Sequence, residues 1–295
     1  MGGGSWTEEK FCSYSRSVGR DVSDGRALLS KDVMQNYKQR RLAEQLNPKN
    51  VMRECRDSAE HPATVPVILA LDVTGSMGDT ANEVAAELNN IMTELYKEVK
   101  DVEFMIAAIG DFVYDNTPLQ VSQFESDVRI AEQLDLVYFE RGGGPNRWES
   151  YSSIWAFAGT QTDLDCWKRG KRGIIITMGD EELNPHIPRP EYEEATGQKD
   201  CYSSNDKDID TEVVYDQVKD KYDIYHINIE HGHRPSMARW EHVLGEDHIF
   251  GCPVSGLAQV IAQIIAQHEN DEVATATAPA TEPVSVIGFT NEISW

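Results

Sequence analysis

An uninterrupted apolar run, VPVILALDV (residues 65–73), constrains the fold of this chain more than any other feature. It ends in a polar, glycine-containing loop, and an amphipathic stretch, ANEVAAELNNIMTELYKEV (residues 81–99), follows. An apolar run without alternation indicates a strand buried on both faces, which is typical of parallel sheets. Two further runs, VEFMIAAIGDF (102–112) and RGIIITMGDEE (172–182), contain a Gly-Asp pair near their ends. We therefore expect repeated strand-loop-helix units in one sheet.

The later pattern extends this sheet. We expect a short edge strand at residues 119–124, helices at 128–134, 211–221 and 254–269, and strands at 222–230 and 246–252. Strands that alternate with helices over about 200 residues predict an α/β fold with a doubly wound, mostly parallel sheet and helices on both faces. A single main domain at residues 61–269 accommodates all of these elements.

The flanking segments differ from this body. Residues 1–60 are too few for a second domain, so we expect an N-terminal arm that packs on the body, with one amphipathic helix at residues 30–46. Residues 270–295 are expected to form a disordered acidic tail, because they carry four acids and no base. The tail includes GFTNEISW (288–295), whose two aromatic residues indicate either a short docking peptide or chance composition.

The charge of the chain excludes some classes of partner. Lys and Arg number 27 against 50 Asp and Glu, a net charge of −23. Such a surface repels phosphate backbones and anionic lipids, so we expect neither nucleic-acid nor membrane binding. Five cysteines without a CxxC pair indicate neither a disulfide framework nor a thiolate zinc site. With no signal-peptide pattern at residues 1–11, we expect a cytoplasmic protein.

Three polar loops follow strands of the predicted sheet. They are DVTGS (72–76), RGGGPNRWES (141–150) and TMGD (177–180). Ligands of open parallel sheets bind at the carboxyl ends of the strands, where the strand order reverses. Singly, each loop is explained by a helix cap, a flexible turn or an ordinary strand end. Together they offer carboxylates and hydroxyls without thiol or imidazole, which predicts a hard cation such as Mg²⁺ or Mn²⁺.

The sequence VILALDVTGSMGD resembles the first motif, D-x-S/T-x-S, of the von Willebrand factor type A domain. That family has a doubly wound sheet with a metal-ion-dependent adhesion site. The second loop resembles the integrin β-type version, in which a Glu takes the metal. The third loop departs from the usual Thr-Asp-Gly, and the chain is most similar to bacterial cytosolic members with Gly-Asp-Glu. The resemblance implies these metal ligands: Asp72, Thr74, Ser76, Glu149 and Asp180.

Three further acids have alternative interpretations. Asp79 either caps the following helix or belongs to an adjacent cation site, as in integrin β subunits. Asp111 is either a turn residue or an outer-shell residue that orients ligands or water. Glu181 is an alternative to Asp180 as the third-loop ligand. The histidines between residues 226 and 248 lack the spacing of a zinc helix motif, so we expect solvated or core side chains.

Two classes of function follow from the loops. The first is a metal-dependent binding module, not an enzyme, in which Mg²⁺ coordinates an Asp or Glu of a partner protein. The resemblance implies an intracellular assembly or adaptor role, with an AAA+ ATPase or a multiprotein assembly as partner. The alternative is a phosphatase similar to haloacid dehalogenases, with Asp72 of DVTGS as the nucleophile.

Overall fold

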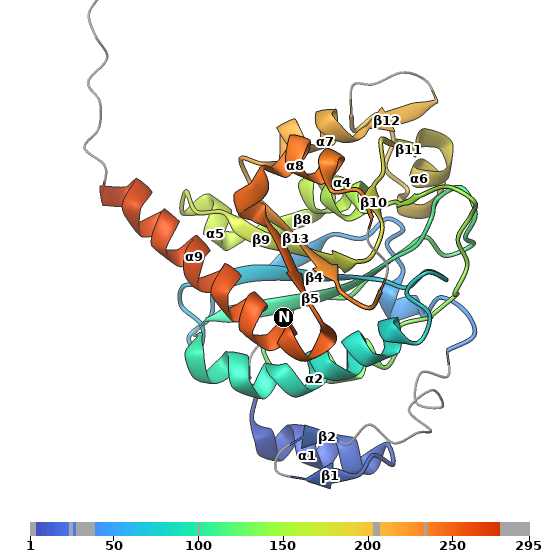
Figure 1. Ribbon diagram of the computed structural model, residues 1–295. Helices are drawn as coiled ribbons and strands as arrows, with labels where there is room; N and C mark the ends of the chain where they lie inside the picture. The colour runs from blue at the N-terminus through green and yellow to red at the C-terminus, as the bar shows by residue number, and fades with distance from the viewer. Residues whose placement is uncertain are drawn as a thin grey trace, which may run out of the picture.

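A six-stranded sheet forms the centre of the protein (Figure 1). The computed structural model describes residues 4–23, 26–27, 39–99, 101–202, 207–232 and 235–277. The spatial order is β14-β13-β9-β4-β5-β6, and within this sheet only β6 runs antiparallel to its neighbour. In chain order the strands are β4 (Val65–Asp72), β5 (Val102–Ile109), β6 (Leu119–Val121), β9 (Gly173–Gly179), β13 (Tyr222–Ile229) and β14 (Ile249–Cys252). The predicted α/β fold class is confirmed.

Helices cover both faces of the sheet, and each face has its own apolar core (Figure 1). Successive residues of β4 alternate between the two cores: Leu69 and Leu71 face one, and Ile68 and Ala70 the other. The first core includes residues of α1 (Glu8–Ser17), α2 (Thr80–Glu98), α3 (Arg129–Leu134) and α9 (Leu257–Thr277). The second includes residues of α4 (Ser152–Gln161), α5 (Asp165–Lys168), α6 (Arg189–Thr196), α7 (Thr211–Val218) and α8 (Ala238–Leu244).

Four two-stranded ladders lie outside the central sheet in the described part of the chain. They are β1 (Val22–Ser23) with β2 (Arg26–Ala27), β3 (Arg53–Cys55) with β8 (Thr162–Leu164), β7 (Trp148–Glu149) with β10 (Glu182–Leu183), and β11 (His186–Pro188) with β12 (Asp208–Asp210). No helix among the described residues is long and apolar enough to cross a membrane. All five cysteines are free thiols, four of them buried.

The strand order reverses between β4 and β9. From β4 the chain goes first to β5 and β6 on one side, and later to β9, β13 and β14 on the other. The loops that follow β4 and β9 therefore leave neighbouring strands at one edge and diverge, which creates the crevice where ligands of such sheets bind. Two of the three predicted polar loops lie at this point.

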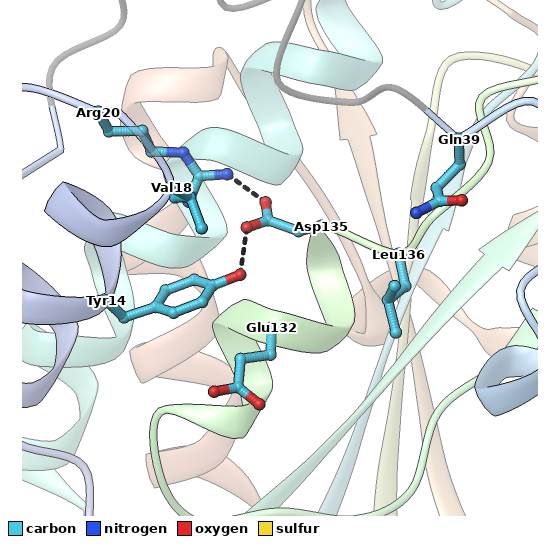
Figure 2. A pocket seen from close by; sticks show the side chains of 7 residues that line it. All are labelled: Tyr14, Val18, Arg20, Gln39, Glu132, Asp135 and Leu136. Atoms are coloured by element: carbon cyan, nitrogen blue, oxygen red, sulfur yellow. Dashed lines mark hydrogen bonds and ion pairs between the residues drawn. The ribbon is translucent and has the colours of Figure 1, made fainter.

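The arm lies beside α2 (Figure 1), and it shares an apolar core with residues of α2 and α3. The Trp6 indole donates to the Thr93 hydroxyl of α2 at 2.9 Å. Asp135, directly after α3, accepts a hydrogen bond of 2.5 Å from the Tyr14 hydroxyl and forms an ion pair with Arg20. Figure 2 shows Tyr14, Arg20 and Asp135 on the wall of a cavity of about 480 Å³ between arm and body.

Two boundaries differ from the sequence-based expectation. The helix expected at residues 30–46 lies partly outside the described residues, and at its end only a 3₁₀ turn, Glu44–Leu46, is present. Ala43 is extended, and the buried Leu46 reaches the core from this irregular segment, so tertiary packing overrides the helical pattern. Helix α9 continues to Thr277, eight residues further than expected, and residues 278–295 of the predicted tail lie outside the described residues.

A buried carboxyl lies near the amino-terminal ends of the parallel strands, opposite the carboxyl ends from which the polar loops leave. Glu103, the second residue of β5, is 1% exposed, and its Oε1 atom has no hydrogen-bond partner. Burial raises the pKa of Glu103 to about 7, and a hydrogen bond with the Cys55 thiol offsets only part of this effect. The protonated form is therefore the one that suits the folded state.

Replacing Glu103 by Gln is expected to stabilise the protein increasingly as pH rises. Because the folded-state pKa of about 7 exceeds the usual 4.5, the unfolding free energy of the wild type falls between these two pH values. The variant lacks this loss. Urea unfolding at about pH 5 and about pH 8 is expected to show that the difference between the proteins grows by about 2 kcal/mol. The same difference at both pH values would contradict the assignment.

Candidate functional site

The three polar loops meet at the edge of the sheet where the strand order reverses. Asp72 ends β4, and its loop is joined to the glycine-rich loop by a hydrogen bond of 2.8 Å from the Gly75 amide to the Gly142 carbonyl. The glycine-rich loop leads into β7, which pairs with β10 directly after the third loop. Backbone pairing therefore holds all three loops in one place.

Hydrogen bonds link four of the five predicted ligands. The Asp72 Oδ1 atom accepts from the Thr74 amide at 2.9 Å and from the Thr74 hydroxyl at 2.6 Å. The Ser76 hydroxyl lies 3.3 Å from the Thr74 hydroxyl and donates to Asp180 Oδ1 at 2.9 Å. Asp72 and Asp180 are both fully buried. Two hydroxyls thus lie between two carboxylates from neighbouring strands.

Glu149 is the fifth predicted ligand, and it is only 5% exposed. Its Oε2 atom is buried and has no hydrogen-bond partner. A side chain at Gly143 would begin 3.6 Å from Glu149 Oε1 and 3.9 Å from Thr74 Cβ, so this glycine lies against both residues. The carboxyl is therefore held beside the first loop with one oxygen unused.

Burial and neighbouring carboxyls raise the pKa of Asp72 and of Glu149. Burial, followed by the nearby Asp180, raises the pKa of Asp72 to about 7. Burial, followed by Asp72 and Asp111, raises the pKa of Glu149 to about 10. Among the described residues, no lysine or arginine forms an ion pair with Asp72, Glu149 or Asp180. Within the described part of the chain, the three carboxyls thus lack the lysine or arginine partner that normally accompanies buried carboxylates.

Two residues at the site were not predicted from the sequence. The Tyr151 hydroxyl donates to Asp72 Oδ2 at 2.6 Å, and Tyr151 is fully buried. The His231 Nε2 atom lies 2.8 Å from Asp180 Oδ2, although we expected this histidine to be solvated or in the core. His231 comes two residues after β13 ends at Ile229. This position at the carboxyl end of a predicted strand is the sequence feature that could have indicated its place at the site.

An aromatic layer supports Tyr151 from behind. Its ring lies 5.1 Å from that of Trp240, which stacks on His226 with a separation of 3.7 Å. Burial lowers the pKa of His226 to about 3, so this core histidine is neutral. The Trp240 indole also donates to the Glu181 carbonyl at 3.2 Å, which fixes the third loop.

The three further acids, Asp79, Asp111 and Glu181, occupy different surroundings. Glu181 follows Asp180, and its amide donates to the Tyr151 hydroxyl at 3.4 Å. Asp79 makes no side-chain cap to α2 and lies 3.4 Å from Arg141 in an exposed ion pair. Asp111 accepts from the Val113 amide at 2.7 Å, as a turn residue does, and from the Asn146 amide group at 2.6 Å. Asp111 thus ties its own loop to the glycine-rich loop.

The glycines of that loop are required by close approach. A side chain at Gly142 would begin 1.7 Å from Asp115 Oδ1, and one at Gly144 would begin 2.0 Å from the Tyr114 ring. The Asp115 carboxylate is itself held by the Asp111 and Gly143 amides. The three glycines are therefore packed against Asp115 and Tyr114, and they do not form a plain flexible turn.

No group of three His, Cys, Asp or Glu side chains in the described part of the chain is placed to hold a metal ion by itself. The candidate set instead combines two hydroxyls with three carboxyls. Hydroxyl and carboxylate oxygens suit hard cations, and the unpartnered Glu149 oxygen gives such a cation an anionic ligand. These residues therefore fit Mg²⁺ or Mn²⁺ by their chemistry.

No protein-family model and no curated protein sequence matches the chain. Among solved structures, it is similar to proximal thread matrix protein 1 from the mussel byssus, with 12% identity and a TM-score of 0.48 over 70% of this chain and 48% of that one. A second structure of that protein, described as having a zinc-occupied MIDAS motif, gives 12% identity and a TM-score of 0.47 over 69% and 47%. The pilus adhesin SpaC from Lactobacillus rhamnosus GG gives 12% and 0.45 over 75% and 31%. The chain thus spans about half of the mussel protein and a third of the adhesin.

Replacing Tyr151 by Phe is expected to lower the unfolding free energy by about 2 kcal/mol, because it removes a donor from a buried carboxylate. Tyr202→Phe is the matched control, since the Tyr202 hydroxyl donates to the neutral Ala156 carbonyl at 2.7 Å. It is expected to lose only about 1 kcal/mol. Urea unfolding in EDTA at about pH 8 measures both. If both variants lose the same unfolding free energy, the hydrogen bond to the Asp72 carboxylate stabilises the protein no more than one to a neutral carbonyl.

Proposed function

We propose that this protein is a metal-dependent protein-binding module whose cation site is formed by the three loops. The observation that carries the proposal is the buried, unpartnered Oε2 atom of Glu149, whose other oxygen lies near Gly143 as Thr74 does. It belongs to a group of buried carboxyls without a lysine or arginine partner among the described residues. A divalent cation supplies the positive charge that this group lacks.

The chain's own contacts favour particular roles for the five residues. Asp72 is engaged by Thr74 and Tyr151, and Asp180 by Ser76 and His231. These two aspartates are therefore suited to orient hydroxyls and water around a cation. Thr74, Ser76 and Glu149 are suited to bind it directly. Mg²⁺ and Mn²⁺ are the cations that this oxygen set favours.

A cation held by few anionic ligands retains affinity for one more carboxylate. We therefore propose that an Asp or Glu of a partner protein completes its coordination, and that the strongly acidic body makes binding depend on the cation. The strand order and the position of the site at the reversal point support the proposed likeness to von Willebrand factor type A domains.

The geometry argues against the phosphatase alternative. Asp72 is fully buried and both of its carboxylate oxygens accept hydrogen bonds, so it is a poor nucleophile. Lys171, the nearest lysine before the third loop in the sequence, precedes β9, whereas Asp180 follows it. The lysine and the aspartate therefore lie at opposite edges of the sheet. Helix α2 also begins directly after the first loop, without an intervening hairpin.

Isothermal titration of the wild type with Mn²⁺ is expected to show binding to one site. Ser76→Ala and Glu149→Gln are each expected to weaken it by at least about tenfold, because each removes a ligand oxygen or its charge. Glu132→Gln is the matched control, since this carboxylate lies on α3 beside the arm cavity. Unchanged affinity in both site variants would contradict the ligand assignment.

A phosphatase assay separates the two classes of function. With p-nitrophenyl phosphate and Mg²⁺, the wild type and Asp72→Asn are expected to give the same background rate. An aspartyl-phosphate mechanism needs an accessible Asp72 oxygen and a cation near the transferred phosphate. Turnover by the wild type that disappears in Asp72→Asn would establish the enzyme instead.

A further inference from the structure

An acid near residue 295 has apolar neighbours of the kind that would suit a ligand for such a site. In the segment VSVIGFTNEISW (residues 284–295), Glu292 is the single acid, and Phe289, Ile293 and Trp295 surround it in the sequence. These residues lie outside the described part of the chain. The pattern combines a carboxylate for a cation with apolar side chains for the surface beside it.

The rim of the candidate site offers such a surface. Val113 and Tyr114, in the loop after β5, are 57% and 50% exposed, and they are adjacent members of a small set of exposed large apolar residues in the described part of the chain. The Tyr114 ring lies against Gly144, and the adjacent Gly143 lies against Glu149 and Thr74. Tyr114 therefore contacts the neighbour of the glycine that lies against Glu149 and Thr74, and Val113 precedes Tyr114 in the sequence. An aliphatic and an aromatic side chain are thus exposed close to the candidate site.

The direction of α9 determines where the segment begins. The helix starts after β14, whose end shares the site's edge of the sheet, and it then runs back antiparallel to the strands (Figure 1). His268 contacts Asp223, the second residue of β13, with 2.6 Å between Nδ1 and Oδ2. The remaining helix, to Thr277, continues past that contact for about 14 Å. The chain therefore leaves the helix at the edge opposite the site.

This exit point favours binding to another copy of the chain. A return to the same site must pass the length of the helix overhang and an eight-residue strand, about 40 Å in all. The fifteen residues from Thr277 to Glu292 span at most about 50 Å. Such a return leaves little slack and loses most of the segment's conformational freedom. A second copy placed beyond the end of α9 meets no such constraint.

We propose that the cation site of one copy binds residues 284–295 of a second copy, with Glu292 at the cation and the neighbouring apolar side chains on Val113 and Tyr114. This inference rests on the proposed metal-dependent function and names its partner. The contact joins one end of a molecule to the opposite end of the next, so it is heterologous and extends into open chains or rings. The cation offsets the repulsion between two acidic bodies.

Sedimentation velocity of the full chain tests the inference. The wild type is expected to form concentration-dependent oligomers in Mg²⁺ and to be monomeric in EDTA. Ser76→Ala, which keeps the segment but impairs the site, and Glu292→Gln, which keeps the site but neutralises the segment, are each expected to be monomeric. An equimolar mixture of the two variants is expected to form dimers only, because each dimer has one usable site and one usable segment.

A synthetic peptide of residues 284–295, acetylated and amidated, is the matched probe. It is expected to dissociate wild-type oligomers in Mg²⁺, whereas the same peptide with Glu292→Gln is not. Tyr114→Ser is expected to weaken self-association by about tenfold and to leave Mn²⁺ titration unchanged, because it removes apolar contact and no ligand. Circular dichroism of each variant checks that the fold is retained.

The outcomes separate this inference from the function on which it rests. Absence of Mn²⁺ binding by the wild type overturns both. Mn²⁺ binding with a monomeric wild type and no peptide binding overturns only the self-association. The self-association is also overturned if the wild-type protein is monomeric and binds the synthetic peptide more weakly than the Glu292→Gln protein does. In that case the segment of the wild-type protein occupies the site of its own molecule.

Discussion

Burial of β4 on all sides is the constraint on which the rest of the structure depends. The strand has hydrogen-bonded neighbours on both sides and an apolar core on each face, so a polar side chain is tolerated only where the strand ends. Asp72 stands at that position and remains fully buried. Its two oxygens then need partners, and Thr74 and Tyr151 supply them.

The same burial makes the site energetically unusual. Buried carboxylates are normally paired with cationic side chains, yet Asp72, Asp180 and Glu149 are gathered with hydroxyls and one histidine among the described residues. Packing alone gives no reason for this arrangement, because apolar residues of similar size would fill the space without repulsion. A cluster that lowers stability at the ligand-binding edge of a sheet is better explained by function.

The sequence predicted most of the sheet because its strands are long, apolar and buried on both faces. It predicted the position of the site for a related reason, since the carboxyl ends of adjacent parallel strands must meet. Helix α4 was missed because eight of its ten residues are buried, which leaves no polar face to mark a period. The expected helix at residues 30–46 was wrong where it is described, because Leu46 packs into the core from an irregular segment.

Side-chain partners were less predictable than backbone elements. Tyr151 and His231 reach the aspartates from segments 79 and 51 residues away in sequence, and no local pattern encodes such a distance. The ligand roles of the five predicted residues, and the disorder expected for residues 278–295, stay predictions.

The three consecutive glycines of the second loop connect the rim of the site to its centre. Gly142 packs against Asp115 and Gly144 against the Tyr114 ring, and Gly143 between them lies near Glu149 and Thr74. A Cβ atom has no room at Gly142 or Gly144, so any larger residue at either position would displace the neighbour that packs there. The buried carboxyls and the exposed Tyr114 ring therefore lie along one short loop that tolerates only glycine at these two positions, and this couples what the loop can evolve at its surface to what it holds inside.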